Sequence, residues 1–343
     1  ALWINLATWV GAPVSTTHSI VGGVMGAGIA AAGFSAVNWM TMSKIAASWV
    51  ISPVLGGVIA ALFLWLIKSR IIYQPDKIAA ARRWVPILIA IMSGAFASYL
   101  ALKGIKKIIK IDIQTAIIIG FLIGVATWAI TKPIIAKQSV GMENRNKSLK
   151  QLFNIPLIVS AALLSFAHGA NDVANAVGPL AAIVQASSSG EYITAISIPL
   201  WVMVIGAAGI SFGLFLFGPK LVRVVGSQIT KLNQMRAYCV ALSAAITVIV
   251  ASWLGLPVSS THIAVGSVFG VGFFREWDSA RRMKLAKLSS DKNQLVVAKE
   301  ERARRKLVRR SHFMSIIAAW IITVPSAAVI SGVIYSVILF SAG

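Results

Sequence analysis

Long apolar segments recur throughout the chain, and they constrain its fold more than any other feature. A helix that crosses a bilayer needs about 20 mainly apolar residues. The segments of roughly this character are nine in number: 1–34, 45–67, 85–102, 113–131, 154–187, 195–217, 237–254, 257–274 and 313–340. No stretch alternates polar and apolar residues for long enough to suggest a membrane β-strand. The sequence therefore predicts an all-α fold, a polytopic transmembrane helical bundle.

Composition and charge agree with a membrane location. Hydrophobic residues make up 57% of the chain and charged residues only 12%, whereas a soluble domain has roughly 45–50% and about 25%. This excludes a soluble enzyme and a DNA-binding module. The net charge is +22, and the basic residues gather between apolar runs, as in the cytoplasmic loops of membrane proteins. We expect a multi-pass protein of the cell (inner) membrane that contacts the lipid bilayer and no nucleic acid.

The positive charge also predicts a topology. Four loops carry most of it and should face the cytoplasm: 68–84, 132–153, 218–236 and 275–312. By the same count the connector at 103–112, with four lysines, should be external, so it does not fit the rule. The loop 275–312 has a second interpretation, because such basic segments also attract anionic lipid headgroups.

An internal duplication is the most informative pattern. Residues 11–26 (GAPVSTTHSIVGGVMG) and 255–270 (GLPVSSTHIAVGSVFG) are identical at ten of sixteen positions, and 45–53 resembles 317–325. The connector that follows the second copy is longer than the one that follows the first, and it is strongly basic, whereas the first has a single lysine. Because basic loops face the cytoplasm, these two equivalent loops should lie on opposite sides of the membrane. This predicts inverted-topology repeats with broken or re-entrant helices, typical of secondary transporters. We divide the chain into 1–131 (first repeat and intervening helices), a linker at 132–153, and a second repeat at 154–343.

A polar stripe lies within one of the apolar runs. Asp172 is the one acidic residue well inside such a run, where a carboxylate costs about 2.5–3.5 kcal/mol. His168, Asn171 and Asn175 share one helical face with it. The Gly178-Pro179 pair that follows should break the helix. Four polar groups beside a helix break indicate a binding site rather than a stabilised core.

The repeated motif supplies hydroxyl groups at two further helix starts. Pro13 and Pro257 can open helices, and the Ser and Thr residues that follow favour an anion through their hydroxyls, their free amides and the helix dipole. Simple N-capping would explain one Ser or Thr in each motif but not three hydroxyls and a histidine in both. His18 and His262 are either structural or supporting ligands.

The segment GANDVANAVGP together with the two PVS[ST]TH motifs resembles the inorganic phosphate transporter (PiT) family, in particular its bacterial members. The resemblance implies a symporter of inorganic phosphate coupled to Na⁺ or H⁺, without cofactors or catalytic residues, and a homodimer. It also implies a site lined by Asn171, Asp172, Asn175, Ser259, Ser260, Thr261, Ser15, Thr16 and Thr17, with His168, His18 and His262 in support. The coupling cation would bind at Asp172.

The family has two copies of the Asn-Asp signature, whereas this sequence has one. Asp172 of the present copy precedes His262 in the chain. The corresponding aspartate of the other copy, at the same spacing before His18, would fall before residue 1, so we expect an N-terminally truncated chain. The functional hypothesis is alternating access of two repeats around one site. Alternatives are a transporter of another oxyanion such as sulfate and, from a different class, an intramembrane enzyme or a channel.

These hypotheses make a geometric prediction. Ser15 and Ser259 should lie near each other, and Asp172 should lie within hydrogen-bonding or one-water distance of the segment 259–261. The four basic loops should lie on one face of the molecule.

Overall fold

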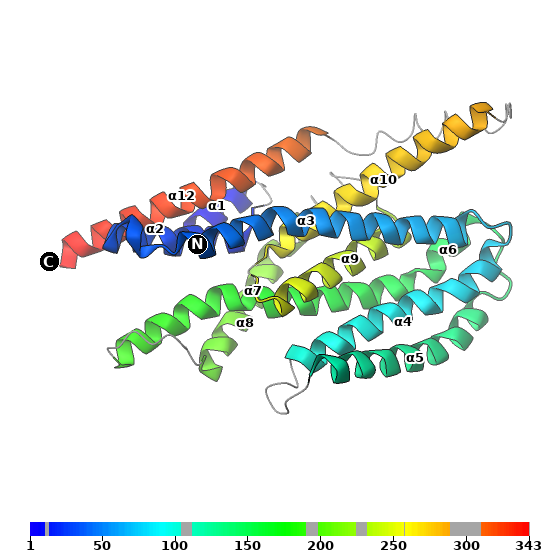
Figure 1. Ribbon diagram of the computed structural model, residues 1–343, viewed down its shortest axis with the longest axis horizontal. Helices are drawn as coiled ribbons and strands as arrows, with labels where there is room; N and C mark the ends of the chain where they lie inside the picture. The colour runs from blue at the N-terminus through cyan, green and yellow to red at the C-terminus, as the bar shows by residue number, and fades with distance from the viewer. Residues whose placement is uncertain are drawn as a thin grey trace.

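A computed structural model of the chain describes residues 1–10, 14–103, 112–189, 198–223, 232–256, 258–288 and 310–342. This part of the chain is nearly all helical and has no strand, so the all-α prediction is confirmed (Figure 1). The helices are α1 (Leu2–Val10), α2 (Thr16–Ala32), η1 (Phe34–Ala36), α3 (Trp39–Ile67), the π-helical turn η2 (Lys68–Ile72), α4 (Lys77–Lys103), α5 (Ile113–Gln138), α6 (Asn146–Leu152), α7 (Asn154–Ser189), α8 (Leu200–Arg223), α9 (Gln234–Trp253), α10 (Ser260–Leu288) and α12 (Arg310–Ala342).

Seven stretches within the described helices are long and apolar enough to cross a membrane: Trp39–Ile72, Lys77–Ala101, Ile113–Gln138, Asn154–Ser187, Leu200–Gly218, Gln234–Ala251 and Ile317–Ser341. Large apolar side chains such as Phe121 and Phe215 project outward from these helices, where lipid would cover them. The runs 1–34 and 257–274 instead give α1, α2 and the first half of α10, and α2 and α10 begin inside the bundle. The chain is a multi-pass membrane protein.

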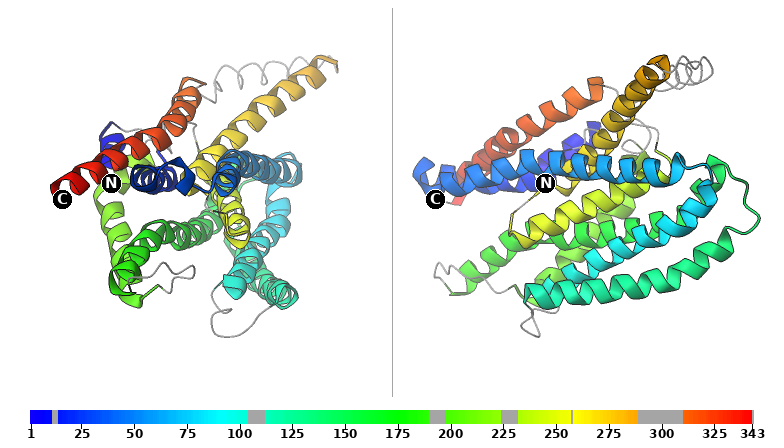
Figure 2. Two further views of the ribbon diagram at one scale, coloured as in Figure 1. Left: turned by 60° about the vertical axis from the view of Figure 1, so that its left-hand side comes forward. Right: turned by 45° about the vertical axis from the view of Figure 1, so that its right-hand side comes forward.

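Two of the three most extensive helix contacts join segments that are far apart in the sequence. In Figures 1 and 2, α2 lies along α12 and α3 along α10, while α4 and α5 form a separate outer pair. Glycines allow the backbones to touch: a methyl group at Gly26 would overlap the carbonyl group of Ala328, and one at Gly270 would overlap that of Gly57. Such small-residue contacts replace hydrophobic burial as the source of helix association in lipid.

The two pairs are equivalent under the sequence repeat. Gly26 and Gly270 are 270 − 26 = 244 positions apart, the offset of the duplicated motif, and their partners are 328 − 57 = 271 positions apart, the offset of its second block. A helix of each repeat therefore packs on a helix of the other. The interlocked pairs agree with the predicted repeat; the exact division of the chain into domains stays a prediction.

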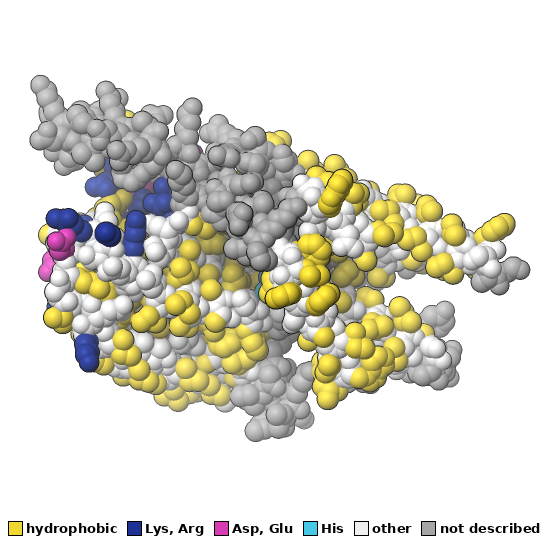
Figure 3. All heavy atoms as spheres, turned by 180° about the vertical axis from the view of Figure 1, so that it is seen from behind, with side chains coloured by type: hydrophobic (Ala, Val, Ile, Leu, Met, Phe, Trp, Pro, Cys, Tyr) yellow, Lys and Arg dark blue, Asp and Glu magenta, His cyan; other side chains and the backbone are white. Residues whose placement is uncertain are grey.

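The basic loops meet at one end of the molecule. Lys68 Nζ lies 2.6 Å from Asp278 Oδ2, the backbone amide of Lys77 donates to Asn144 Oδ1 (2.9 Å), and Arg82 Nε donates to Ser139 Oγ (2.5 Å). Lys and Arg side chains gather at this end in Figure 3. The described parts of 68–84, 132–153 and 275–312 thus lie on one face. The middle of the fourth predicted loop, residues 224–231, falls outside the described residues. Most of the lysine-rich connector 103–112 falls outside the described residues.

The predicted break at Gly178-Pro179 is wrong. Helix α7 continues through both residues to Ser189. A proline within a helix removes only its own amide donor, and neighbouring groups can take up the freed carbonyl at membrane depth. That carbonyl belongs to Asn175, four residues earlier. Pro13 and Pro257, predicted to open helices, lie outside the described residues.

Candidate functional site

Helices α2 and α10 begin in the same way. The hydroxyl of Ser15 accepts a hydrogen bond from the backbone amide of His18, and the hydroxyl of Ser259 accepts one from the amide of His262, both at 3.2 Å. These are ordinary N-caps, with the serine directly before the first helical residue. One serine in each motif therefore stabilises its helix by capping.

The residues after each cap offer free donors. The backbone hydrogen bonds of α2 and α10 begin with Ser19 N to Ser15 O and Ile263 N to Ser259 O. The amides that precede them in the first turn have no intrahelical acceptor, and the positive ends of the helix dipoles lie there. These amides belong to Thr16 and Thr17 in α2 and to Ser260 and Thr261 in α10. Two helix starts suited to an anion therefore face the same region of the bundle.

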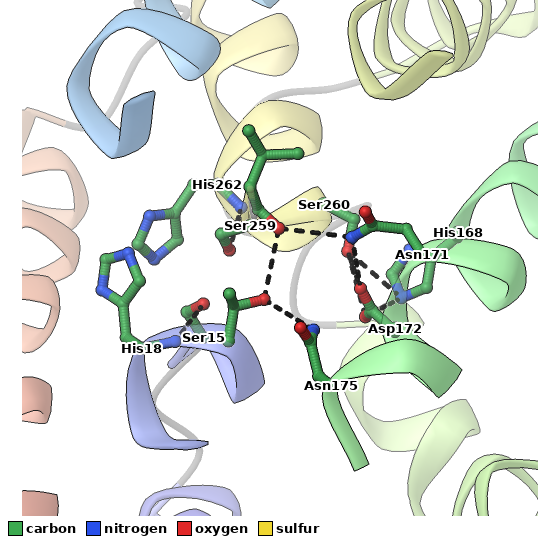
Figure 4. A network of polar contacts seen from close by, with 11 residues as sticks. Ser15, His18, His168, Asn171, Asp172, Asn175, Ser259, Ser260 and His262 are labelled. Carbon is green, nitrogen blue, oxygen red and sulfur yellow. Dashed lines mark hydrogen bonds and ion pairs between the residues drawn. The ribbon is translucent and has the colours of Figure 1, made fainter. Parts of the chain in front are cut away.

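Asp172 on α7 is the centre of the site (Figure 4). Its carboxylate accepts hydrogen bonds from Ser260 Oγ at 3.1 and 3.2 Å and from Asn171 Nδ2 at 3.1 Å. His168 Nε2 lies 2.8 Å from Asp172 Oδ2 and 3.4 Å from Ser260 Oγ. The Asp172 side chain is only 12% exposed, so these donors offset much of its lost hydration.

A second set of bonds connects α7 to both repeated motifs. Asn171 Nδ2 and Thr17 Oγ1 donate to the backbone carbonyl of Val258, at 3.3 and 3.2 Å, and Asn175 Nδ2 donates to Thr17 Oγ1 at 2.9 Å. The carbonyl lies in the non-helical segment just before α10. The stripe on α7 and the two motifs thus form one network, and Ser15 and Ser259 both border it (Figure 4).

Sequence reasoning did not identify Val258 as part of the site. It contributes a main-chain oxygen, so its side-chain type carries no signal. A non-helical carbonyl between two apolar helices is nevertheless a group that must find a donor at membrane depth. The interruption of the apolar run beside Gly255, which has a positive φ of 71°, is the feature that could have pointed to it.

Not every predicted residue joins this network. The rings of His18 and His262 point away from Asp172 toward each other (Figure 4). His18 packs against Trp49 with the rings tilted, and His262 stacks on Trp320, with ring centroids 3.8 and 3.7 Å apart. Within the described residues, Thr16 and Thr261 are half-buried at the helix starts and have no side-chain hydrogen bond to the network.

The donor set favours a hard cation over a transition metal. A carboxylate, a main-chain carbonyl and a hydroxyl (Asp172, Val258 and Thr17) lie close together, and oxygen ligands of these types suit alkali and alkaline-earth ions. Within the described part of the chain, no group of three or more His, Cys, Asp or Glu side chains is placed to hold a metal ion. The site therefore combines two helix starts suited to an anion with one carboxylate.

Comparison with known proteins identifies the family. Residues 1–331 match the sequence profile described as the phosphate transporter family. The chain belongs to this family. Phosphate transporters are not enzymes, so the enzyme hypothesis is discarded.

Individual relatives support this membership. A Helicobacter pylori protein named "Putative phosphate permease" is 45% identical over 98% of this chain and 72% of its own length. An Arabidopsis thaliana protein named "Inorganic phosphate transporter 2-1, chloroplastic" is 32% identical over 97% of this chain and 56% of its own length. A solved structure titled "The sodium-dependent phosphate transporter" is 33% identical, with a TM-score of 0.84 over 99% of this chain and 77% of the solved chain.

Proposed function

We propose that this member of the phosphate transporter family is a secondary active symporter that carries inorganic phosphate across the cell (inner) membrane with Na⁺. The observation that carries the proposal is the network around Asp172, which joins α7 to the starts of α2 and α10. The similarity to a structure titled a sodium-dependent phosphate transporter favours Na⁺ over H⁺ as the coupling ion. The basic loops would then face the cytoplasm.

The helix starts would bind the phosphate oxygens. Each presents first-turn amides and hydroxyls at the positive end of a helix dipole, and such a start binds anions without a cationic side chain. Ser260 is in hydrogen-bonding contact with Asp172, and Thr17 with Asn175. A phosphate bound between the two starts would replace these contacts with its own oxygens, so the same hydroxyls serve the empty and the loaded site.

Asp172 would make the site depend on a cation. A carboxylate beside an anion is repulsive unless a positive ion or a proton lies between them. Na⁺ bound by Asp172 and the Val258 carbonyl would remove this repulsion, so phosphate and Na⁺ would each favour the binding of the other. Phosphate at neutral pH often carries a proton, and its P–OH group could also donate to the carboxylate.

The movement needed for alternating access would come from the two helix pairs. The pairs α2–α12 and α3–α10 make equivalent backbone contacts on the two sides of the site. Each pair can move as a rigid unit, because its glycine contacts leave little room for sliding. Rocking of one pair against the other would open the site to one side of the membrane at a time.

Uptake of labelled phosphate into liposomes that contain the full-length protein tests the proposal. An inward Na⁺ gradient should drive accumulation, and a pH gradient without Na⁺ should not. Accumulation driven by the pH gradient alone would reassign the coupling ion to H⁺. Excess unlabelled sulfate should leave uptake unchanged, because sulfate has no proton at neutral pH to offer Asp172; strong inhibition by sulfate would contradict phosphate selectivity.

A further inference from the structure

A cavity lined by aromatic and charged side chains lies far along α10 from the Asp172 site, at the end where the basic loops meet. It has a volume of about 210 Å³ and opens between the end of α3 and the second half of α10. Trp65, Phe274 and Trp277 form apolar walls, and Arg281 and Arg282 lie on its lining. The two helices diverge beyond this point in Figures 1 and 2. The transport hypothesis makes no use of this cavity.

The inner part of the cavity is electrically neutral. Lys68 Nζ lies 2.6 Å from Asp278 Oδ2, and Tyr73 Oη donates to the same oxygen at 2.5 Å. The Lys68 and Asp278 side chains are only 11% and 13% exposed. One buried cation and one buried anion cancel, so this ion pair contributes no net charge to the cavity.

The outer part of the cavity carries two guanidinium groups, of which that of Arg282 also interacts electrostatically with Asp278. Arg282 packs over the ring of Tyr73, with its guanidinium carbon 4.0 Å from the ring centroid, and Arg281 packs over Trp277 at 5.4 Å. Both arginines are exposed, and within the described residues neither has a carboxylate within 4 Å. The aromatic rings hold two guanidinium groups at the mouth of the cavity, ready to bind an anion.

The surroundings of the cavity are those of a membrane interface. The candidate membrane span that begins in α3 ends at Ile72, directly before Tyr73. Trp65 and Trp277 line the same cavity as Tyr73, and such aromatic residues are typical of the headgroup region. On α10, Trp277 and Leu285 are exposed beside the two arginines. Exposed apolar and basic side chains on one helix are typical of a segment that lies in the interface. A ligand there would need both an anionic group and an apolar body.

We propose that this cavity binds the phosphate group of an anionic phospholipid, such as phosphatidylglycerol. The guanidinium groups of Arg281 and Arg282 bind the phosphodiester oxygens, which planar guanidinium groups contact through paired hydrogen bonds. The acyl chains lie along Trp65 and Leu285. This assigns to the start of the 275–312 loop the lipid interaction that its charge alone left open. The proposal does not depend on what the protein transports.

Native mass spectrometry of the full-length protein tests this proposal. The delipidated protein is mixed with equal amounts of phosphatidylglycerol and phosphatidylcholine in detergent. The wild type should retain phosphatidylglycerol selectively, and Arg281→Gln/Arg282→Gln should bind it at least tenfold more weakly. The control Lys284→Gln/Lys147→Gln removes the same charge from exposed lysines that do not line the cavity, and it should bind like the wild type.

Two results would overturn the proposal. Equal losses in the two double variants would mean that the lipid responds to net charge and not to this cavity. Displacement of the lipid by millimolar inorganic phosphate would assign the arginines to free phosphate instead. Because Arg282 also packs on Tyr73, Arg281→Gln alone provides a variant that leaves this contact intact, and it should still weaken phosphatidylglycerol binding severalfold.

Discussion

The imidazole rings of His18 and His262 meet edge to face, with their centroids 4.3 Å apart. The two residues occupy the same position in the duplicated motif, 262 − 18 = 244 residues apart. Equivalent positions of two repeats come this close only beside the axis that relates them. Trp49 and Trp320, which also correspond under the repeat, extend the contact on either side. The four rings therefore mark the axis that relates the repeats, and His18 and His262 lie next to the Asp172 network (Figure 4).

Two substitutions of His262 test whether its ring acts through packing or through its nitrogen atoms. The side chain is fully buried, and within the described residues its ring nitrogens have no hydrogen-bond partner. His262→Phe keeps a ring against Trp320 and should retain phosphate uptake. His262→Ala leaves a cavity and should cost about 2–5 kcal/mol, measured as a lower thermal midpoint in detergent. A folded His262→Phe protein that has lost uptake would show that the imidazole nitrogens act in transport.

Asp172→Asn should abolish phosphate uptake and leave membrane insertion unchanged. The amide preserves the size of the side chain but removes its charge. A hydrogen bond to a charged group contributes about 3 kcal/mol, and its loss corresponds to a more than 100-fold weaker affinity. Uptake into liposomes and the amount of protein in the membrane fraction are the measurements. Asp112→Asn is the matched control, because Asp112 caps α5 far from the site and asparagine caps equally well. Retained uptake in Asp172→Asn would contradict the site.

Substitutions of two glycines on α2 test the close packing of α2 on α12. A methyl group at Gly26 would overlap the backbone of Ala328, whereas one at Gly28 would have no atom within 4 Å. Gly26→Ala should destabilise the protein by about 1–3 kcal/mol, and Gly28→Ala should be neutral or stabilise it by up to about 1 kcal/mol through helix propensity. Thermal unfolding in detergent measures both. Equal midpoints for the two variants would rule out the close α2–α12 contact.

The ion pair between Lys68 and Asp278 predicts that the stability of the protein decreases at low pH. Burial opposes ionisation of Asp278, but hydrogen bonds from Lys68 and Tyr73 and the nearby positive charges outweigh it and hold the pKa of Asp278 below its ordinary value of 3.8. A lowered pKa stabilises the folded state above pH 3.8, and this contribution is lost as the pH falls through the folded value. The thermal midpoint of the wild type should therefore fall more steeply than that of Asp278→Asn as the pH is lowered below about 4.

The control for this measurement is an exposed ion pair. Glu143 and Arg145 lie 3.0 Å apart with side chains that are mostly exposed, and such pairs contribute little to stability. Glu143→Gln should follow the wild-type curve. Equal slopes for the wild type and Asp278→Asn would show that the buried pair does not set the acid response.

The main features of the site could be predicted from sequence because polar groups are costly in an apolar background. Asp172 must be compensated at membrane depth, and residues at helical spacing share its face. The repeat placed Ser15 and Ser259 at equivalent helix starts, and both cap their helices. The chemical roles of these residues in transport stay predictions.

Other features could not be predicted, because they depend on contacts between helices. Whether Pro179 breaks α7 depends on what surrounds the freed carbonyl, and the helix continues. The direction of the His18 ring depends on Trp49 in α3 and on the partner ring of His262. The role of Val258 lies in its main chain, which a side-chain pattern does not describe.

Each repeat packs one of its helices on a helix of the other repeat, and this has a consequence for how much of the chain can fold on its own. Because α2 is covered by α12 and α10 by α3, a polypeptide with only one repeat would expose two glycine-lined helix faces to lipid. Two copies of such a half-length chain would cover these faces by pairing antiparallel. The present chain therefore behaves as an antiparallel dimer of halves whose members are joined covalently, and the joint keeps each half at a high effective concentration for the other.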